Sequence, residues 1–123
     1  VSKEYLEETI EKKKQEIQKK KDLYRKGKDL PPLKDKIVIL TDDGVATGST
    51  IKTAVKILES EAPKQIVAAI PVAPPKTARD IESMVDRWIC LEKPEAFRSV
   101  GQFYEDFAQI TDQTVVKLLE STQ

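Results

Sequence analysis

The segment IVILTDDGVATGST, residues 37–50, decides how this chain is expected to fold. Residues 37–40 are apolar and mostly β-branched without polar alternation, which is typical of a central strand covered on both faces of a parallel sheet. Residues 42–50 form a turn-rich stretch with two glycines. Apolar residues then recur at the spacing i, i+3, i+4 and i+7 over residues 51–60, and this spacing predicts an amphipathic helix.

Two more strands are expected after that helix. The run QIVAAI at residues 65–70 predicts a second buried strand, and residues 85–91 predict a third. Between them, Pro71 and the pair Pro74 and Pro75 indicate a rigid loop, which leads into a short helix over residues 76–84. Strands that alternate with helices favour right-handed crossovers and parallel pairing. The predicted fold class is therefore α/β, a parallel sheet of at least three strands with flanking helices.

The two ends of the chain differ from this core. Residues 3–25 contain no Gly or Pro and are rich in good helix formers, so they predict a long helix capped by Ser2. Residues 97–107 hold four of the seven aromatic residues, and Thr111 is placed to cap a last helix. We expect a single domain over residues 1–123, made of a long basic helix (1–30), the α/β core (36–92), and an aromatic loop with a C-terminal helix (93–123).

Composition excludes several classes of chemistry. The chain has 21 Lys and Arg, 21 Asp and Glu, no His and one Cys, so it has no imidazole base and no histidine metal ligand. Cys90 cannot form an intrachain disulfide, and no apolar run approaches the ~20 residues of a membrane span. We therefore expect a cytoplasmic protein with no membrane partner. The lysine runs at 12–14 and 19–21 are interspersed with Glu along the helix and lack an accompanying aromatic face, which favours a solvated helix face over nucleic-acid binding.

The loop at residues 42–50 has the composition of a site for a phosphorylated sugar. Gly44 and Gly48 allow positive φ and a close approach of the backbone to a ligand. The loop leads into a helix, where free amides and the positive end of the helix dipole suit a phosphate. Thr47, Ser49 and Thr50 add hydroxyl donors. Asp42 and Asp43 add carboxylates, which could accept hydrogen bonds from sugar hydroxyls or help hold a cation.

A simpler interpretation of this loop is an acidic turn that caps a helix, with Thr47 or Ser49 as the N-cap residue. The loop also lacks the Gly-Lys-Ser/Thr ending of a Walker loop and the Gly-x-Gly-x-x-Gly pattern of a dinucleotide-binding turn. Those two classes of nucleotide site are therefore not indicated.

The segment closely resembles the motif of type I phosphoribosyltransferases that binds phosphoribosyl pyrophosphate (PRPP), in which apolar residues and two acids precede a Thr-Gly-x-Thr phosphate cradle. The resemblance is to the carboxyl-terminal half of the bacterial and archaeal predicted phosphoribosyltransferases. It extends over most of the chain, through residues 24–27, 37–50, 68–74 and 97–107. It implies a phosphoribosyltransferase-like fold whose amino-terminal part lies outside residues 1–123.

The resemblance also implies an activity and a set of site residues. The activity is the Mg²⁺-dependent transfer of the phosphoribosyl group from PRPP to a nucleobase, with release of pyrophosphate. Asp42 and Asp43 would be the catalytic acids, which bind the ribose 2′- and 3′-hydroxyls and through them the metal. Residues that would bind the substrate and its 5′-phosphate are Gly44, Val45, Ala46, Thr47, Gly48, Ser49 and Thr50. Ala46 stands where hypoxanthine-guanine enzymes have an acid, which argues against that subclass.

A looser resemblance concerns the aromatic loop. Phe103 and Tyr104 could stack on a nucleobase, and Glu105 or Asp106 could reach a second Mg²⁺. The alternative is an aromatic cluster that packs over the edge of the sheet.

The expected ligands are PRPP and a nucleobase or nucleoside monophosphate. Nothing in residues 1–36 resembles the pyrophosphate-binding loop of the family, and the chain has too few amphipathic helices to cover both faces of a parallel sheet. We therefore expect this chain to pair either with an amino-terminal half outside the sequence or with a second copy of itself. An alternative function is a non-catalytic nucleotide-binding or protein-interaction module on the same fold.

Overall fold

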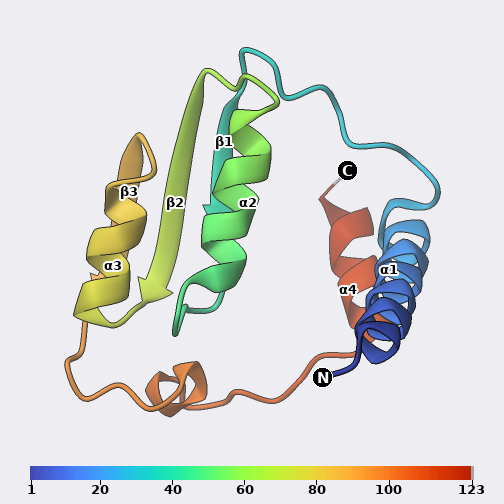
Figure 1. The fold of residues 1–123 in the computed structure, drawn as a ribbon. Helices are drawn as coiled ribbons and strands as arrows, with labels where there is room; N and C mark the ends of the chain where they lie inside the picture. The colour runs from blue at the N-terminus through green and yellow to red at the C-terminus, as the bar shows by residue number, and fades with distance from the viewer. Residues whose placement is uncertain (123) are drawn as a thin grey trace. The chain divides into compact units, whose positions relative to one another are not determined.

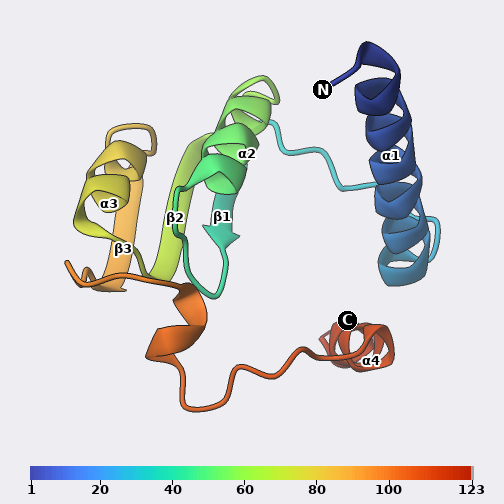
Figure 2. The ribbon, with the colours of Figure 1, turned by 60° about the horizontal axis from the view of Figure 1, so that its bottom comes forward.

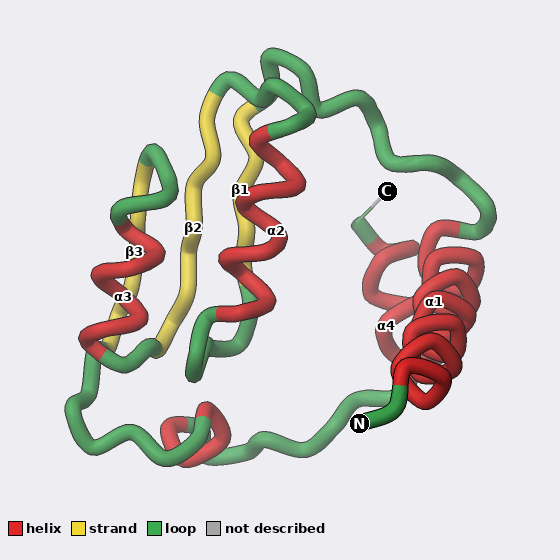
Figure 3. Tube along the Cα trace, viewed as in Figure 1, coloured by secondary structure: helices red, strands yellow, loops and turns green. Residues whose placement is uncertain are grey.

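The computed structural model describes residues 1–122, which form two compact units (Figure 1). One unit consists of Val1–Pro31 together with the segment that begins at Ala108, and the other is Pro32–Phe107. Helices and strands alternate along the second unit, as Figure 3 shows. This second unit contains the α/β sheet and the candidate site.

The sheet has three parallel strands, as predicted. Strands β1 (Ile37–Thr41), β2 (Gln65–Val72) and β3 (Arg87–Glu92) lie in the order β1-β2-β3. Val38 pairs with Ile66 in the first ladder, and Ala68 pairs with Trp88 in the second. Because all three strands run the same way, the loops that follow β1 and β2 lie at the same edge of the sheet. This edge holds residues 42–48.

Two helices connect the strands and cover one face of the sheet. Helix α2 (Ser49–Glu59) joins β1 to β2, and α3 (Pro75–Glu82) joins β2 to β3. Both lie on the same side, as successive right-handed crossovers in one direction require (Figures 1 and 2). The hydrophobic core lies between these helices and the sheet and consists of Val45, Ile51, Val55, Ile66, Ala68, Ile70, Ala73, Ala78 and Ile81.

The other face of the sheet is open within this unit. Ile37 and Ile39 on β1 are 56% and 65% exposed, and Ile89 and Leu91 on β3 are 43% and 77% exposed. The expectation that residues 37–40 form a central strand covered on both faces is therefore wrong for the described residues: β1 pairs with β2 alone and is an edge strand. The physical reason is that residues 32–107 place both helices on one face.

Several element boundaries also differ from the expected ones. Helix α2 begins at Ser49 rather than at residue 51, α3 spans Pro75–Glu82, and β3 begins at Arg87. Pro71 lies inside β2 and not in a loop. The ladder between β2 and β3 pairs Ile70 with Cys90 and Val72 with Glu92 but skips Pro71, which has no N–H to donate.

The first unit pairs two helices, α1 (Lys3–Arg25) and α4 (Asp112–Ser121). Both predicted caps are confirmed, since the Ser2 side chain accepts from the Tyr5 amide and that of Thr111 accepts from the Thr114 amide. The Tyr24 hydroxyl donates to Asp112 Oδ1 at 2.7 Å. Helix α1, which is described along its whole length, has no buried residue. No helix within residues 1–122 is long and apolar enough to cross a membrane.

Candidate functional site

The loop after β1 forms a cleft of about 210 Å³ at the carboxyl edge of the sheet, lined by Asp42 and by residues 44–51. This edge is where ligands of open α/β sheets bind. The loop is short because β1 ends at Thr41 and α2 begins at Ser49. The structure therefore brings Asp42 and the predicted phosphate-binding residues together around one cleft.

Gly48 is required by both conformation and space. Its φ is +79°, in the left-handed region that favours glycine, and a Cβ there would lie 2.9 Å from Thr77 Cγ2. This confirms the predicted positive φ at Gly48. The same prediction is wrong for Gly44, whose φ lies outside that region. At Gly44 the requirement is packing, because a Cβ would lie 2.7 Å from Val100 Cγ1 and 2.8 Å from Val72 Cγ1.

Gly48 also serves as the N-cap residue of α2, so the simpler interpretation with Thr47 or Ser49 at that position is wrong. Gly48 has no side chain to bond the first amides of the helix. Within the part of the chain that the structure describes, the amides of Thr47, Gly48 and Thr50 donate to no protein acceptor. The Thr47 and Ser49 hydroxyls lie 3.1 Å apart beside them. Unpaired donors at a helix start favour an anion.

Asp42 and Asp43 supply the negative charge of the site, and both are exposed. The Asp43 amide donates to Asp42 Oδ1 at 2.9 Å, which holds the Asp42 carboxylate beside the backbone of its neighbour. Some loss of hydration at this mostly exposed carboxyl, followed by repulsion from the Asp42 carboxylate, raises the pKa of Asp43 above its ordinary value. Asp43 thus accepts a proton at a higher pH than a solvated aspartate does.

Three contacts from distant segments hold the loop in place. The Val45 amide donates to the Val72 carbonyl at 3.0 Å, and the Thr77 hydroxyl donates to the Ala46 carbonyl at 2.8 Å. The Tyr104 hydroxyl donates to the Asp43 carbonyl. Sequence reasoning did not identify Thr77, because a single threonine in a short helix carries no pattern that links it to a loop 31 residues earlier.

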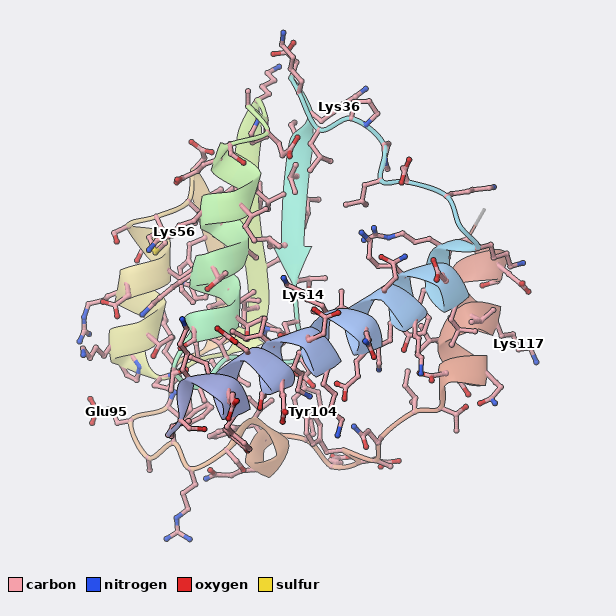
Figure 4. The ribbon with its side chains drawn as sticks, turned by 45° about the vertical axis from the view of Figure 1, so that its right-hand side comes forward. Lys14, Lys36, Lys56, Glu95, Tyr104 and Lys117 are labelled. Atoms are coloured by element: carbon pink, nitrogen blue, oxygen red, sulfur yellow. The ribbon has the colours of Figure 1, made fainter. Side chains whose placement is uncertain are left out.

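The aromatic residues after β3 pack in pairs around the 3-10 helix at Val100–Phe103. The ring centroids of Phe97 and Phe103 lie 5.4 Å apart, and those of Tyr104 and Phe107 lie 5.2 Å apart. Tyr104, labelled in Figure 4, also contacts the loop through the Asp43 carbonyl. This packing is what the aromatic-cluster interpretation expects, while stacking of Phe103 or Tyr104 on a base stays a prediction.

The described residues contain no group of three or more His, Cys, Asp or Glu side chains placed to hold a metal ion. Mg²⁺ is commonly bound through one or two carboxylates together with oxygens of a phosphorylated substrate. The pair Asp42 and Asp43 fits that second mode, because both carboxylates are exposed and Asp42 lines the cleft, with Asp43 next to it in the chain.

The fold and the cleft define an α/β protein with a glycine-containing loop between its first strand and the helix that follows. Residues 1–108 match the family model described as "Phosphoribosyl transferase domain". The chain belongs to this family, which confirms the resemblance found in the sequence.

Relatives and a solved structure agree with this assignment. The "Putative phosphoribosyl transferase" proteins Rv0571c and MT0597, from two strains of Mycobacterium tuberculosis, are each 35% identical to this chain over 89 residues. The match covers 72% of this chain and 20% of each relative, so the chain spans about a fifth of their length. TT1426 from Thermus thermophilus, solved as a crystal structure, is 30% identical with a TM-score of 0.82, over 98% of this chain and 58% of that one.

Proposed function

We propose that the cleft at residues 42–51 binds the ribose 5-phosphate part of PRPP, and that the protein transfers this phosphoribosyl group to a nucleobase. The observation that carries the proposal is one cleft that combines the Asp42 carboxylate with a helix start whose amides are unpaired, while the exposed Asp43 follows Asp42 in the chain. The carboxylates suit the ribose hydroxyls, and the amides suit the 5′-phosphate. Family membership supports the same ligand.

In this proposal the protein contributes chiefly positioning and electrostatics. The amides of Thr47, Gly48 and Thr50 and the neighbouring hydroxyls hold the phosphate, while Asp42 and Asp43 accept hydrogen bonds from the 2′- and 3′-hydroxyls. With both ends of the sugar held, C1 is presented to the acceptor base. The bond from C1 to pyrophosphate breaks as the bond to a base nitrogen forms, and that nitrogen releases its proton to solvent. Nearby carboxylates stabilise the positive charge that develops on the ribose.

Mg²⁺ is the proposed metal, held by Asp42 and Asp43 through the ribose hydroxyls, with Asp106 as a proposed further ligand. When bound, it would neutralise charge on the departing pyrophosphate. Phe103 and Tyr104 are proposed to face the nucleobase, because the Tyr104 hydroxyl ties this segment to the Asp43 carbonyl.

The open face of the sheet supports a proposal about assembly. Ile37, Ile39, Ile89 and Leu91 expose apolar side chains on one face, whereas parallel sheets are normally covered on both. We propose that either a second copy of this chain or polypeptide of the kind present in the longer relatives covers this face.

One observation favours a second candidate, the non-catalytic nucleotide-binding or protein-interaction module. The chain has four glycines, and one turn between a strand and a helix contains any of them, at residues 42–48. The turn between β2 and α3 consists of Ala73 and Pro74, so it lacks the backbone freedom of the first. Between the described strands and helices, the glycine-containing type of turn is therefore found after β1 and not after β2.

Titration of ribose 5-phosphate, and of PRPP with Mg²⁺, followed by calorimetry, tests the proposal. Asp42→Asn and Asp43→Asn should each weaken PRPP binding by about ten- to a hundredfold, the range for loss of one hydrogen bond to a charged group. Asp35→Asn is the matched control, because Asp35 precedes Lys36 and β1 at the opposite end of that strand (Figure 4).

The outcomes separate the two candidates. Binding of PRPP followed by pyrophosphate release in the presence of a nucleobase supports the transferase. Binding without release supports the non-catalytic module. If the wild-type protein binds neither ribose 5-phosphate nor PRPP, or if the two aspartate variants bind as well as the Asp35→Asn control, the assignment of this cleft is wrong.

A further inference from the structure

Among the described residues, Thr77 is the one polar residue that is buried, with 8% of its surface exposed. It lies in the first turn of α3, yet its hydroxyl does not cap that helix, because it donates to the Ala46 carbonyl at 2.8 Å. Its methyl group lies against Gly48, where an added Cβ would approach Thr77 Cγ2 to 2.9 Å. Both branches of this one side chain therefore touch the proposed phosphate-binding loop.

The hydrogen bond to Ala46 determines how the next amide points. The described chain contains no cis peptide bond. In a trans peptide the carbonyl of one residue and the N–H of the following residue point in opposite directions. A carbonyl of Ala46 that points at α3 therefore directs the Thr47 N–H away from α3. That N–H has no protein acceptor among the described residues, and Thr47 lines the cleft.

We propose that Thr77 is a positioning residue for phosphate binding: its hydroxyl sets the Ala46–Thr47 peptide plane so that the Thr47 amide is presented to the phosphate. This inference rests on the proposed function of the cleft. A free loop would populate several orientations of this peptide, and the ordering would then have to occur on binding. Thr77 removes part of that requirement in advance.

Two substitutions separate the hydroxyl from the methyl group. Thr77→Val keeps the shape and loses the donor, whereas Thr77→Ser keeps the donor and loses the buried methyl. Thr53→Val is the matched control, because Thr53 belongs to α2 but does not line the cleft at residues 42–51. Affinity for ribose 5-phosphate is measured by calorimetry, and the melting temperature of each variant is measured alongside.

We expect Thr77→Val to bind ribose 5-phosphate roughly three- to tenfold more weakly than wild type, the effect of one lost neutral hydrogen bond. Thr77→Ser and Thr53→Val should bind within about twofold of wild type, even where the cavity left in Thr77→Ser lowers its melting temperature. A purely structural role would make affinity follow melting temperature. Wild-type affinity in Thr77→Val, or affinity that follows melting temperature across the set, overturns the inference.

A second measurement keeps the inference testable if wild-type protein fails to bind ribose 5-phosphate, a result that would count against the proposed function. In the ligand-free protein, Thr77→Val should shift the NMR resonances of the Ala46 carbonyl carbon and the Thr47 amide, while Thr77→Ser leaves both near their wild-type positions. Unchanged resonances in Thr77→Val overturn the inference independently of any ligand.

Discussion

The Tyr104 hydroxyl donates a hydrogen bond to the backbone carbonyl of Asp43, a residue 61 positions earlier in the chain. Val100, from the same segment, packs against Gly44, where a Cβ would lie 2.7 Å from its Cγ1 atom. The segment that follows β3 therefore supports the acidic end of the loop, while Thr77 supports its centre. The loop is held by parts of the chain that are remote from it in sequence.

Tyr104→Phe tests whether this support matters to ligand binding. The ring is kept, so its packing on Phe107 should persist, but the donor to the Asp43 carbonyl is lost. We expect a loss of about 0.5–1.5 kcal/mol of stability and a weaker affinity for ribose 5-phosphate. Tyr5→Phe on α1 is the control. If Tyr104 acts only by stacking on a base, Tyr104→Phe will leave ribose 5-phosphate affinity at its wild-type value.

Gly48→Ala should be more damaging than Gly27→Ala, although both glycines have positive φ, +79° and +75°. At Gly27 an added Cβ meets nothing within 4 Å, so the cost is the backbone penalty of about 1–2 kcal/mol. At Gly48 the Cβ also meets Thr77 Cγ2 at 2.9 Å, and loop amides must move. Urea unfolding and ribose 5-phosphate titration measure both effects. Equal unfolding free energies for the two variants would contradict the packing argument.

The affinity of the cleft for Mg²⁺ and PRPP should decrease as the pH falls, and the decrease should begin above the pH at which an ordinary aspartate titrates. Burial and the neighbouring Asp42 raise the pKa of Asp43, and a protonated carboxyl accepts hydrogen bonds from ribose hydroxyls less well. Calorimetry across the acidic range measures the midpoint. In Asp43→Asn this part of the pH dependence should disappear. A midpoint at or below the ordinary aspartate value would contradict the raised pKa.

The same shift has a consequence for stability. Because the folded-state pKa of Asp43 is higher than its unfolded-state value, the folded protein binds more protons in the window between the two, and stability decreases as the pH rises through it. The unfavourable contribution is fully present above the folded pKa and absent below the unfolded one. Asp43→Asn should therefore gain stability relative to wild type as the pH is raised from the acidic range to neutrality. A difference in unfolding free energy that does not change with pH would refute this.

What could be predicted from the sequence was local. Residues 37–59 form a strand, a loop and a helix in direct succession, so the apolar run, the glycines and the helical spacing pointed to the same unit and to the candidate site within it. Parallel pairing followed from the alternation of strands and helices. Both inferences use signals that lie within a few residues of one another.

What could not be predicted depends on contacts between distant residues. The support of Ala46 by Thr77 and of Asp43 by Tyr104 spans 31 and 61 residues. Thr77 carries no local signal, and the resemblance that singled out Tyr104 implied stacking on a base rather than a bond to this loop. The requirement for glycine at position 44 comes from Val72 and Val100 rather than from its own φ. The exposure of Ile39 was missed because an apolar strand shows that a face needs cover but does not show which segment supplies it.

The exposed face of the sheet leads to the last prediction, which concerns self-association of this chain. Ile39→Asp should remain folded, because Ile39 is 65% exposed, and should abolish any association that uses this face. Ile57→Asp is the matched control, because Ile57 is 60% exposed on α2, a helix on the other side of the sheet. A specific dimer needs about 1,000 Å² of buried surface or more. The measurement is sedimentation at micromolar concentration. If wild type and Ile57→Asp sediment as dimers while Ile39→Asp sediments as a monomer, a second copy of the chain covers this face. A wild-type monomer would leave polypeptide of the kind found in the longer relatives as the proposed cover.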